Sequence, residues 1–346
     1  MDCAGRRLNQ CGCGHHLAAR STHWPIRPGA HHAQTLAAHG GAECRCAHFH
    51  RPDGVGSERR WGAATGGRRL ARGPRRRRRG GGLAGAGGLS ALPRPRCRDL
   101  PYERWRTRTP KDSKDPALLA SMLPDAAVLE TMLGEAGIGN DDHLVIVGTG
   151  RSAGDLAAAA RVFWTLKVLG HDAVSVLDGG LIAYADAGAP LARGPERRPP
   201  TTFKATLRPA LAPDAAAVEA ARADATQLVD ARSEGEFVGI YTGDSDERPG
   251  TIPGAKHLPY DWVAADGGAT LRSAGALAQL FEARGIDPAG AQIHFCHSGN
   301  RAALSWFAAY AVLGNEQARL YDGSMMEWAQ SEDRPVAAAI ELCEAC

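Results

Sequence analysis

The residues with the clearest chemical potential lie at 293–302, where the chain reads Ile-His-Phe-Cys-His-Ser-Gly-Asn-Arg-Ala. A short apolar run ending at Phe295 predicts a buried strand, and the apolar spacing of 302–313 predicts a helix closed by Gly314. A loop between a strand and a helix N-terminus binds anions, because free backbone N–H groups and the helix dipole are directed into it. Cys296 opens this loop, where its thiolate should be stabilised. We therefore expect a nucleophilic cysteine that handles an anionic substrate.

The elements that must position this loop alternate between short apolar runs and stretches with helical spacing. The expected strands, of the buried and parallel kind, are 144–147, 173–177, 226–232 and 319–321. The expected helices are 126–136, 155–169, 214–223 and 271–284. This alternation predicts an α/β fold with mostly parallel sheets flanked by helices.

An internal repeat divides the patterned part of the chain in two. Residues 164–180 and 308–324 match at a constant offset of 144, sharing Val-Leu-Gly and then Asp-Gly. The same offset puts Ser152 opposite Cys296, whereas alignment of the strand ends puts Gly148 there. Neither residue is a cysteine, so we expect the second copy to hold the chemistry and the first to be a scaffold.

Residues 1–110 differ from the rest of the chain in composition. They hold 22 arginines, no lysine and only 6 acidic residues, so they carry a net charge of +16 while the remainder carries −13. Counterparts of the segments 229–232 and 249–255, expected 144 residues earlier, are not found there. We therefore expect a disordered or non-native Arg/Gly-rich low-complexity segment, and an incomplete first domain with missing strands.

Three interpretations of this segment are open. The run of arginines at 75–79 is typical of an arm that binds nucleic acid. Closely spaced cysteines and histidines at 11–16 and 44–50 suit a metal, although C-x-C does not match the spacing of structural zinc fingers. Arginine without lysine in a background of Gly, Ala and Pro is also what a GC-rich reading frame gives when it is translated out of phase. The composition favours this last interpretation or plain disorder, so nucleic acid is not expected as a partner.

Four motifs stand out in the patterned part of the chain: Val-Asp-Ala-Arg at 229–232, Pro-Gly-Thr-Ile-Pro-Gly-Ala at 249–255, Cys-His-Ser-Gly-Asn-Arg at 296–301 and Leu-Tyr-Asp-Gly-Ser-Met-Met-Glu-Trp at 320–328. On these motifs, residues 112–346 resemble the two-domain rhodaneses, the family of thiosulfate and 3-mercaptopyruvate sulfurtransferases. Thr251 departs from the histidine that the family usually has, at a position that looks structural. The resemblance implies tandem rhodanese-like domains, of which only the second is catalytic. The expected segments are a partial inactive domain at 111–195, a linker at 196–212 and the catalytic domain at 213–340.

The resemblance also implies a mechanism. The Cys296 thiolate would take the sulfane sulfur of thiosulfate, become a persulfide, and pass the sulfur to a thiol or cyanide. Arg301 is expected to bind the donor anion. Arg232 is expected to be a second anion contact, unless it pairs with Glu234 or Glu236. Asp230 is expected to be structural and to hold loop amides. The remaining candidates for substrate binding are the loop residues His297, Ser298, Gly299 and Asn300.

The alternatives differ in the donor and in the class of protein. Mercaptopyruvate enzymes use extra arginines to hold a carboxylate, and Glu236 lies where one is expected, which favours thiosulfate. Related cysteine phosphatases have five residues between the cysteine and the arginine, whereas four separate Cys296 from Arg301. A non-catalytic sulfur-carrier or interaction module is the remaining alternative.

This chemistry requires no cofactor and no metal. No apolar run approaches the roughly 18–20 residues that span a bilayer, and the N-terminus lacks the apolar core of a secretory signal. Only Cys296, Cys343 and Cys346 lie in the patterned part of the chain, which argues against a disulfide framework. We therefore expect a reducing, cytoplasmic location without a membrane partner, and we interpret Cys343 and Cys346 as part of a frayed tail.

Overall fold

The computed structural model describes residues 96–107, 121–189, 191, 198–243 and 248–340, together with the strand at 45–48. The cysteine and histidine groups at 11–16 and 44–50, the arginine run at 75–79 and the cysteines at 343 and 346 lie outside the residues whose side chains are described. The description below therefore concerns the two copies of the repeat.

The first copy is built on a four-stranded sheet in the order β2-β1-β3-β4, with every neighbouring pair parallel. Its strands are β1 (Arg45–His48), β2 (Arg96–Asp99), β3 (Leu144–Val147) and β4 (Val174–Val176). Its helices are the 3₁₀ turn η1 (Tyr102–Trp105), α1 (Ala126–Glu135), α2 (Ala153–Val168) and α3 (Gly180–Asp186).

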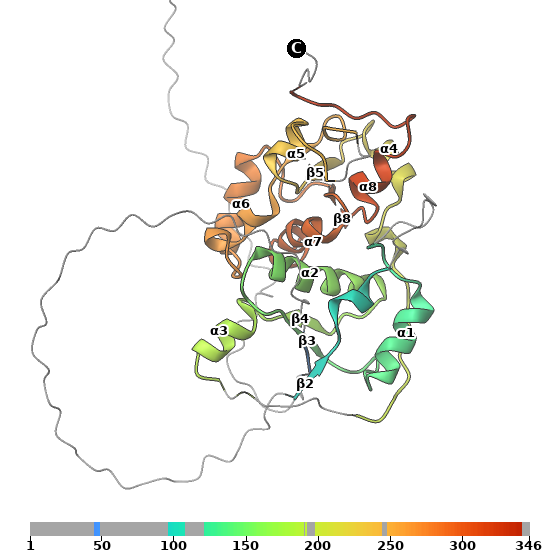
Figure 1. The fold of residues 1–346 in the computed structure, drawn as a ribbon, viewed down its shortest axis with the longest axis vertical. Coiled ribbons are helices and arrows are strands. Elements are labelled where there is room, and N and C mark those ends of the chain that lie inside the picture. Colours follow the sequence, from blue (N-terminus) through green and yellow to red (C-terminus); the bar gives the residue numbers. More distant parts are fainter. Residues whose placement is uncertain are drawn as a thin grey trace, which may run out of the picture. The chain divides into compact units, whose positions relative to one another are not determined.

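The second copy has a four-stranded parallel sheet in the order β6-β5-β7-β8. Its strands are β5 (Gln227–Asp230), β6 (Lys256–His257), β7 (Gln292–Phe295) and β8 (Ala318–Leu320). Its helical elements are η2 (Pro209–Leu211), α4 (Ala215–Ala221), α5 (Glu234–Val238), η3 (Tyr260–Val263), η4 (Ala265–Gly267), α6 (Ala274–Ala283), α7 (Asn300–Phe307), the π-helical turn η5 (Ala308–Val312) and α8 (Ser324–Trp328). Figure 1 shows both copies and labels helices α1 to α8 and strands β2, β3, β4, β5 and β8.

Both sheets have the same strand order, as the internal repeat predicts. β1 and β2 lie at the two places where the sequence has no recognisable counterparts of β5 and β6. β2 and η1 precede residue 110 but belong to the first copy, and Trp105 is buried in its core. Neither strand has the continuous apolar run by which the other strands were predicted.

The segment expected as a linker packs along the first copy. Phe203 is buried, and the amides of Thr201 and Thr206 donate to the carbonyls of Gly134 and Leu169 at 2.9 Å each. Residues 201–206 of this segment are therefore fixed to the first copy by backbone hydrogen bonds and by one buried ring.

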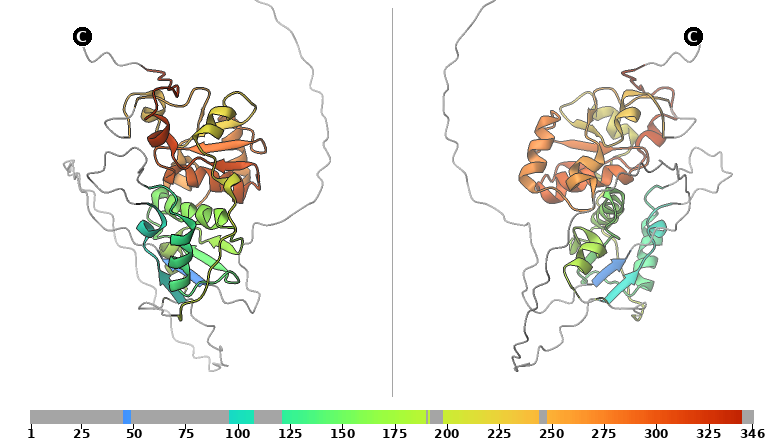
Figure 2. Two further views of the ribbon diagram at one scale, coloured as in Figure 1. Left: turned by 90° about the vertical axis from the view of Figure 1, so that its right-hand side faces the viewer. Right: turned by 60° about the vertical axis from the view of Figure 1, so that its left-hand side comes forward.

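Helices α2 and α7 form the main contact between the copies (Figure 1), and Figure 2 shows from two further sides that they meet there. The Phe163 ring of α2 packs edge-on against Phe307 of α7, with centroids 4.9 Å apart, and lies 6.1 Å from the Trp306 ring. Burial of large aromatic rings from both helices makes the core continuous across the repeat. A helix that carries first-copy side chains therefore lies directly against the helix that follows Cys296.

The two loops that precede α2 and α7 differ in ways that matter for chemistry. β3 ends at Val147 and β7 ends at Phe295, so Gly148 takes the place of Cys296 when the strand ends are matched. Helix α7 starts after Gly299, whose φ of 73° is in the left-handed region that glycine adopts without strain. The helix predicted at 302–313 continues beyond α7 only as the π-helical turn η5.

Candidate active site

Cys296 is buried at the carboxyl end of β7, and its loop is held by hydrogen bonds to the start of α8. The Ser324 hydroxyl accepts hydrogen bonds from the amides of Cys296 and Gly299, at 3.1 Å each, and donates to the Tyr321 carbonyl at 2.9 Å. The amides of Met325 and Met326 donate to the carbonyls of Cys296 and His297 at 3.0 and 2.9 Å. The Gly299 amide is thus committed to Ser324, so it is not one of the amides that can face the sulfur.

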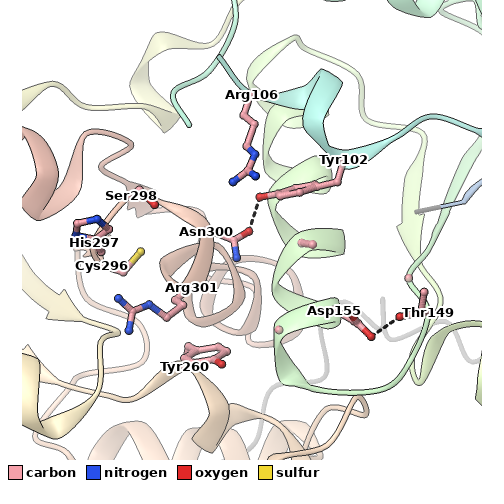
Figure 3. A pocket seen from close by; sticks show the side chains of 13 residues that line it. Tyr102, Arg106, Thr149, Asp155, Tyr260, Cys296, His297, Ser298, Asn300 and Arg301 are labelled. Carbon is pink, nitrogen blue, oxygen red and sulfur yellow. Dashed lines mark hydrogen bonds between the residues drawn. The ribbon is translucent and has the colours of Figure 1, made fainter. Parts of the chain in front are cut away.

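A cavity of about 300 Å³ opens in front of Cys296, at the small end of the range for ligand sites. Figure 3 shows that residues of the cysteine loop lie on one side of it and residues of the first copy on the other. The second copy contributes Tyr260, Cys296, His297, Ser298, Asn300 and Arg301. The first copy contributes Tyr102, Arg106, Gly148, Thr149, Gly154, Asp155 and Ala158.

Arg301 lines this cavity, but its charge is already paired. Its two terminal nitrogens donate to the two carboxylate oxygens of Glu236, at 2.6 and 2.7 Å. Burial acts to raise the pKa of Glu236, yet the hydrogen bonds and charge of Arg301 bring it down to about 2. Burial acts to lower the pKa of Arg301, but the hydrogen bonds and charge of Glu236 raise it above its usual value. Arg301 thus reaches the cavity as one half of a bidentate ion pair.

Arg232, expected as a second anion contact, does not line the cavity. It is fully buried, with Nε and Nη2 donating to the Asp230 carboxylate at 2.7–3.1 Å and Nη2 donating to the Gly250 carbonyl at 2.7 Å. Its partner is Asp230, not Glu234 or Glu236.

Asp230 is fully buried at the end of β5. Its carboxylate accepts from the amide of Arg232 at 2.9 Å and from the Thr251 hydroxyl at 2.8 Å. Thr251, which stands where histidine is usual in the resembling family, therefore completes a buried hydrogen-bond network around Asp230.

Tyr102 and Arg106 of the first copy reach the cysteine loop, and neither was predicted. The Tyr102 hydroxyl donates to Oδ1 of Asn300, which leaves the Nδ2 amide of Asn300 as its remaining donor (Figure 3). Burial raises the pKa of Tyr102, whereas the charges of Arg161 and Arg106 act to lower it. Both residues fall in the stretch whose arginine content suggested disorder. The available signal was the aromatic pair Tyr102 and Trp105 within that stretch.

A second contact between the copies lies directly behind the loop. Nη2 of Arg161, on α2, is 2.5 Å from Oδ1 of Asp322, and the Leu123 amide donates to Oδ2 of the same carboxylate at 2.6 Å. The Arg161 guanidinium also lies over the Trp164 ring, 4.5 Å from its centre. Both groups approach Gly299 so closely that a methyl group there would overlap Nη1 of Arg161.

The equivalent loop of the first copy holds its own anion. The Asp155 carboxylate accepts from the Thr149 hydroxyl and from the Arg151 amide, the latter at 2.9 Å. Ser152 caps α2 by accepting from the Asp155 amide. A carboxylate of the protein therefore fills the loop at the start of α2, where the second copy presents Cys296.

The structure thus brings together Cys296, His297, Ser298, Asn300 and Arg301 around one cavity, and it leaves Arg232 and Asp230 outside. Gly299 belongs to the loop but not to the cavity wall. Among the residues that the structure describes, no three His, Cys, Asp or Glu side chains are grouped so that they could hold a metal ion. None of the described helices has the length and apolarity needed to cross a membrane.

Comparison with known proteins identifies the family of this chain. The rhodanese-like domain family matches residues 214–331. Thiosulfate sulfurtransferase of Bos taurus is 35% identical over 215 residues, which cover 60% of this chain and 69% of the bovine protein. The chain belongs to the rhodanese family of sulfurtransferases. The rhodanese match itself covers the second copy alone, the copy that contains Cys296.

Two solved structures have folds similar to that of this chain. SseA from Escherichia coli, described as a 3-mercaptopyruvate sulfotransferase, superposes with a TM-score of 0.54 at 28% identity, over 66% of this chain and 81% of SseA. The anaerobic ergothioneine biosynthesis enzyme from Chlorobium limicola gives a TM-score of 0.60 at 20% identity, over 71% of this chain and 60% of that enzyme. The second likeness shows a shared fold alone.

Proposed function

We propose that this protein transfers a sulfane sulfur from thiosulfate to a thiol or cyanide, through a persulfide on Cys296. The observation that carries the proposal is a buried cysteine at a strand end that opens into a small polar cavity. Cys296 is the only free cysteine among the residues whose side chains the structure describes. The bovine relative, a thiosulfate sulfurtransferase, supports the reaction class.

The reaction has two balanced halves. The Cys296 thiolate attacks the outer sulfur of thiosulfate, the sulfur–sulfur bond breaks, and sulfite leaves with the bonding pair. An acceptor thiolate or cyanide then attacks the terminal sulfur of the persulfide and regenerates the Cys296 thiolate. The amides of Cys296 and Gly299 are held by Ser324, so the other loop amides and the N-terminus of α7 are the groups available to stabilise the negative charge that moves between these atoms.

His297, Ser298 and Asn300 contribute polar side chains to the same wall of the cavity. The Asn300 amide is the best oriented of the three, since Tyr102 holds its oxygen. Arg301 contributes positive potential through a guanidinium whose two terminal nitrogens are held by Glu236. Gly299 contributes by its backbone, because it lets the loop turn into α7.

The choice of thiosulfate over 3-mercaptopyruvate rests on the same ion pair. Arg301 is the arginine of the cysteine loop, and both of its terminal nitrogens already donate to Glu236, so this pair of parallel donors is not available to the carboxylate of 3-mercaptopyruvate. SseA, described as a 3-mercaptopyruvate sulfotransferase, keeps that donor as the second candidate. A non-catalytic sulfur-carrier module is the third, since a persulfide on Cys296 could be handed on without turnover.

Steady-state assays with both donors, and cyanide as acceptor, test the proposal. We expect wild type to turn over thiosulfate faster than 3-mercaptopyruvate, and Cys296→Ser to be inactive with both. After thiosulfate alone, mass spectrometry should find the mass of one added sulfur on the peptide that contains Cys296. Loading without turnover would favour the carrier module, and no loading with either donor would refute sulfur transfer.

A further inference from the structure

Fewer positive charges are available to a bound anion than the arginines in and near the cavity indicate. Thiosulfate and the sulfite that leaves it are dianions, so the site must compensate two negative charges. Arg301 is paired with Glu236, and Arg232 is paired with Asp230 and lies outside the cavity. Loop amides and the helix dipole supply only partial charges. The structure must therefore supply a further cation from another element.

Arg106, from the first copy, is the arginine on the cavity wall that has no carboxylate partner among the described residues. Its one hydrogen bond there runs from Nη1 to the Ser121 hydroxyl and is long, at 3.3 Å. A guanidinium has five N–H donors, so most of its donors remain available. Figure 3 shows its guanidinium directed into the space between Tyr102 and Ser298, across from Cys296.

Tyr102 holds this guanidinium in place and links it to the cysteine loop. The Arg106 guanidinium carbon lies 5.0 Å from the centre of the Tyr102 ring, within the range of a cation–π contact. The hydroxyl of the same ring donates to Asn300 at the start of α7. One aromatic side chain thus fixes a cation of the first copy relative to the loop of the second.

We propose that Arg106 binds the oxyanion end of the sulfur donor, while the sulfur to be transferred faces Cys296. The inference rests on the proposed function, because it assigns the charged end of that same donor. An arginine suits this task, since its planar fork matches the oxygens of a sulfonate or sulfite. The first copy then lacks a nucleophile but supplies a substrate-binding residue, and the donor lies between the two copies.

Protection of Cys296 from alkylation tests this without relying on turnover. Full-length protein is treated with iodoacetamide at constant ionic strength and increasing sulfate, an oxyanion with no sulfur to transfer. Alkylation of the Cys296 peptide is followed by mass spectrometry. The variants are Arg106→Gln and Arg106→Lys. The matched control is Arg104→Gln, because Arg104 lies on η1 two residues before Arg106, is paired with Glu135 and is absent from this cavity.

We expect sulfate to protect wild type and Arg104→Gln equally. Arg106→Gln should require roughly 10- to 100-fold more sulfate for half-protection, the range for a lost hydrogen bond to a charged group. Arg106→Lys should recover much of the difference, because it restores the charge but not the fork. Urea midpoints within error of wild type would show that the variants fold.

Three results would overturn the assignment: no protection of wild type, equal protection of Arg106→Gln, or an equal loss in Arg104→Gln. Sulfur loading of Cys296 by thiosulfate is measured separately in wild type. Protection that depends on Arg106 in a protein that never loads sulfur would refute the sulfurtransferase proposal while supporting the anion site. Sulfur loading of wild type, together with unchanged sulfate protection in Arg106→Gln, would support the sulfurtransferase proposal and refute the anion site at Arg106.

Discussion

Arg161 and Asp322 form a buried ion pair across the two copies, with Nη2 and Oδ1 2.5 Å apart and side-chain exposures of 1% and 10%. The pair lies behind Gly299, so it joins the first copy to the loop that carries Cys296. Asp322 also accepts from the Leu123 amide, which attaches a second segment of the first copy. Two elements of the copy without a nucleophile therefore depend on one carboxylate of the other copy.

Asp322→Asn should be strongly destabilising. It leaves the Arg161 guanidinium buried without its counter-charge, and removal of one partner from a buried pair costs about 3–5 kcal/mol. Urea unfolding measures the change in the free energy of unfolding. The double variant Arg161→Leu, Asp322→Leu should recover most of the loss, because no buried charge remains. A single variant within about 0.5 kcal/mol of wild type would contradict this account.

The part of the site that sequence patterns predicted is the part made by contiguous residues. β3 lies at 144–147, as its apolar run indicated, and most residues of the loop 296–301 line the cavity. The partners of Arg232 and Arg301 were not predictable in this way. Which carboxylate meets which guanidinium depends on α5, a short helix that the apolar pattern did not reveal and that carries Glu236 to Arg301.

The contribution of the first copy was missed for a different reason. Tyr102 and Arg106 follow a strand without an apolar run, in a stretch dominated by arginine. Their roles come from packing across the repeat, and a one-dimensional pattern contains no record of contacts between residues about 200 positions apart. The resemblance to the family also implied an anion contact at Arg232. In the structure this side chain is buried and donates to the carboxylate of Asp230.

Gly299→Ala should damage the loop more than the same change at Gly314. Both glycines have nearly the same φ, 73° and 74°, so both substitutions carry a similar backbone cost of about 1–2 kcal/mol. A Cβ at Gly314 meets no atom within 4 Å, whereas one at Gly299 overlaps Arg161 and lies 2.7 Å from Oδ1 of Asp322.

We therefore expect Gly299→Ala to cost about 1–3 kcal/mol beyond Gly314→Ala, as overpacking does, and to slow sulfur loading of Cys296. Gly314→Ala should keep the loading rate of wild type. Urea unfolding and single-turnover sulfite release measure the two effects. Equal losses of stability and equal loading rates in the two variants would contradict the predicted overlap of a Cβ at residue 299 with Arg161.

Ser324→Ala should loosen the cysteine loop. It removes one hydroxyl that accepts from two buried amides, those of Cys296 and Gly299, and each unsatisfied group costs about 1–3 kcal/mol. A matched control is Ser273→Ala, which removes the single cap of α6 far from the loop in sequence and should cost about 1 kcal/mol. Hydrogen exchange should quicken at the loop amides in Ser324→Ala only. Protection equal to that of wild type there would contradict the assigned role of the hydroxyl.

Glu236→Gln should remove a pH-dependent part of the stability. The pKa of Glu236 is lowered to about 2 in the folded protein from an ordinary value of 4.5, so the ionised form is favoured by folding. Such a group contributes in full above about pH 4.5, and the contribution is lost as the pH falls toward 2. The shift corresponds to about 3 kcal/mol. Gln keeps the length of the side chain and an oxygen that can accept from Ser233, so the variant isolates the charge.

Urea unfolding between pH 7 and pH 3 measures this directly. Wild type should be more stable than Glu236→Gln at pH 7, and the gap should narrow as the pH falls below about 4.5 because Glu236 becomes protonated in the unfolded chain first. Glu234→Gln is the control, since this exposed residue shares α5 but makes no ion pair among the described residues. Its curve should run parallel to that of wild type. A gap between wild type and Glu236→Gln that stays constant over the whole range would mean that the pair with Arg301 does not hold the carboxylate ionised.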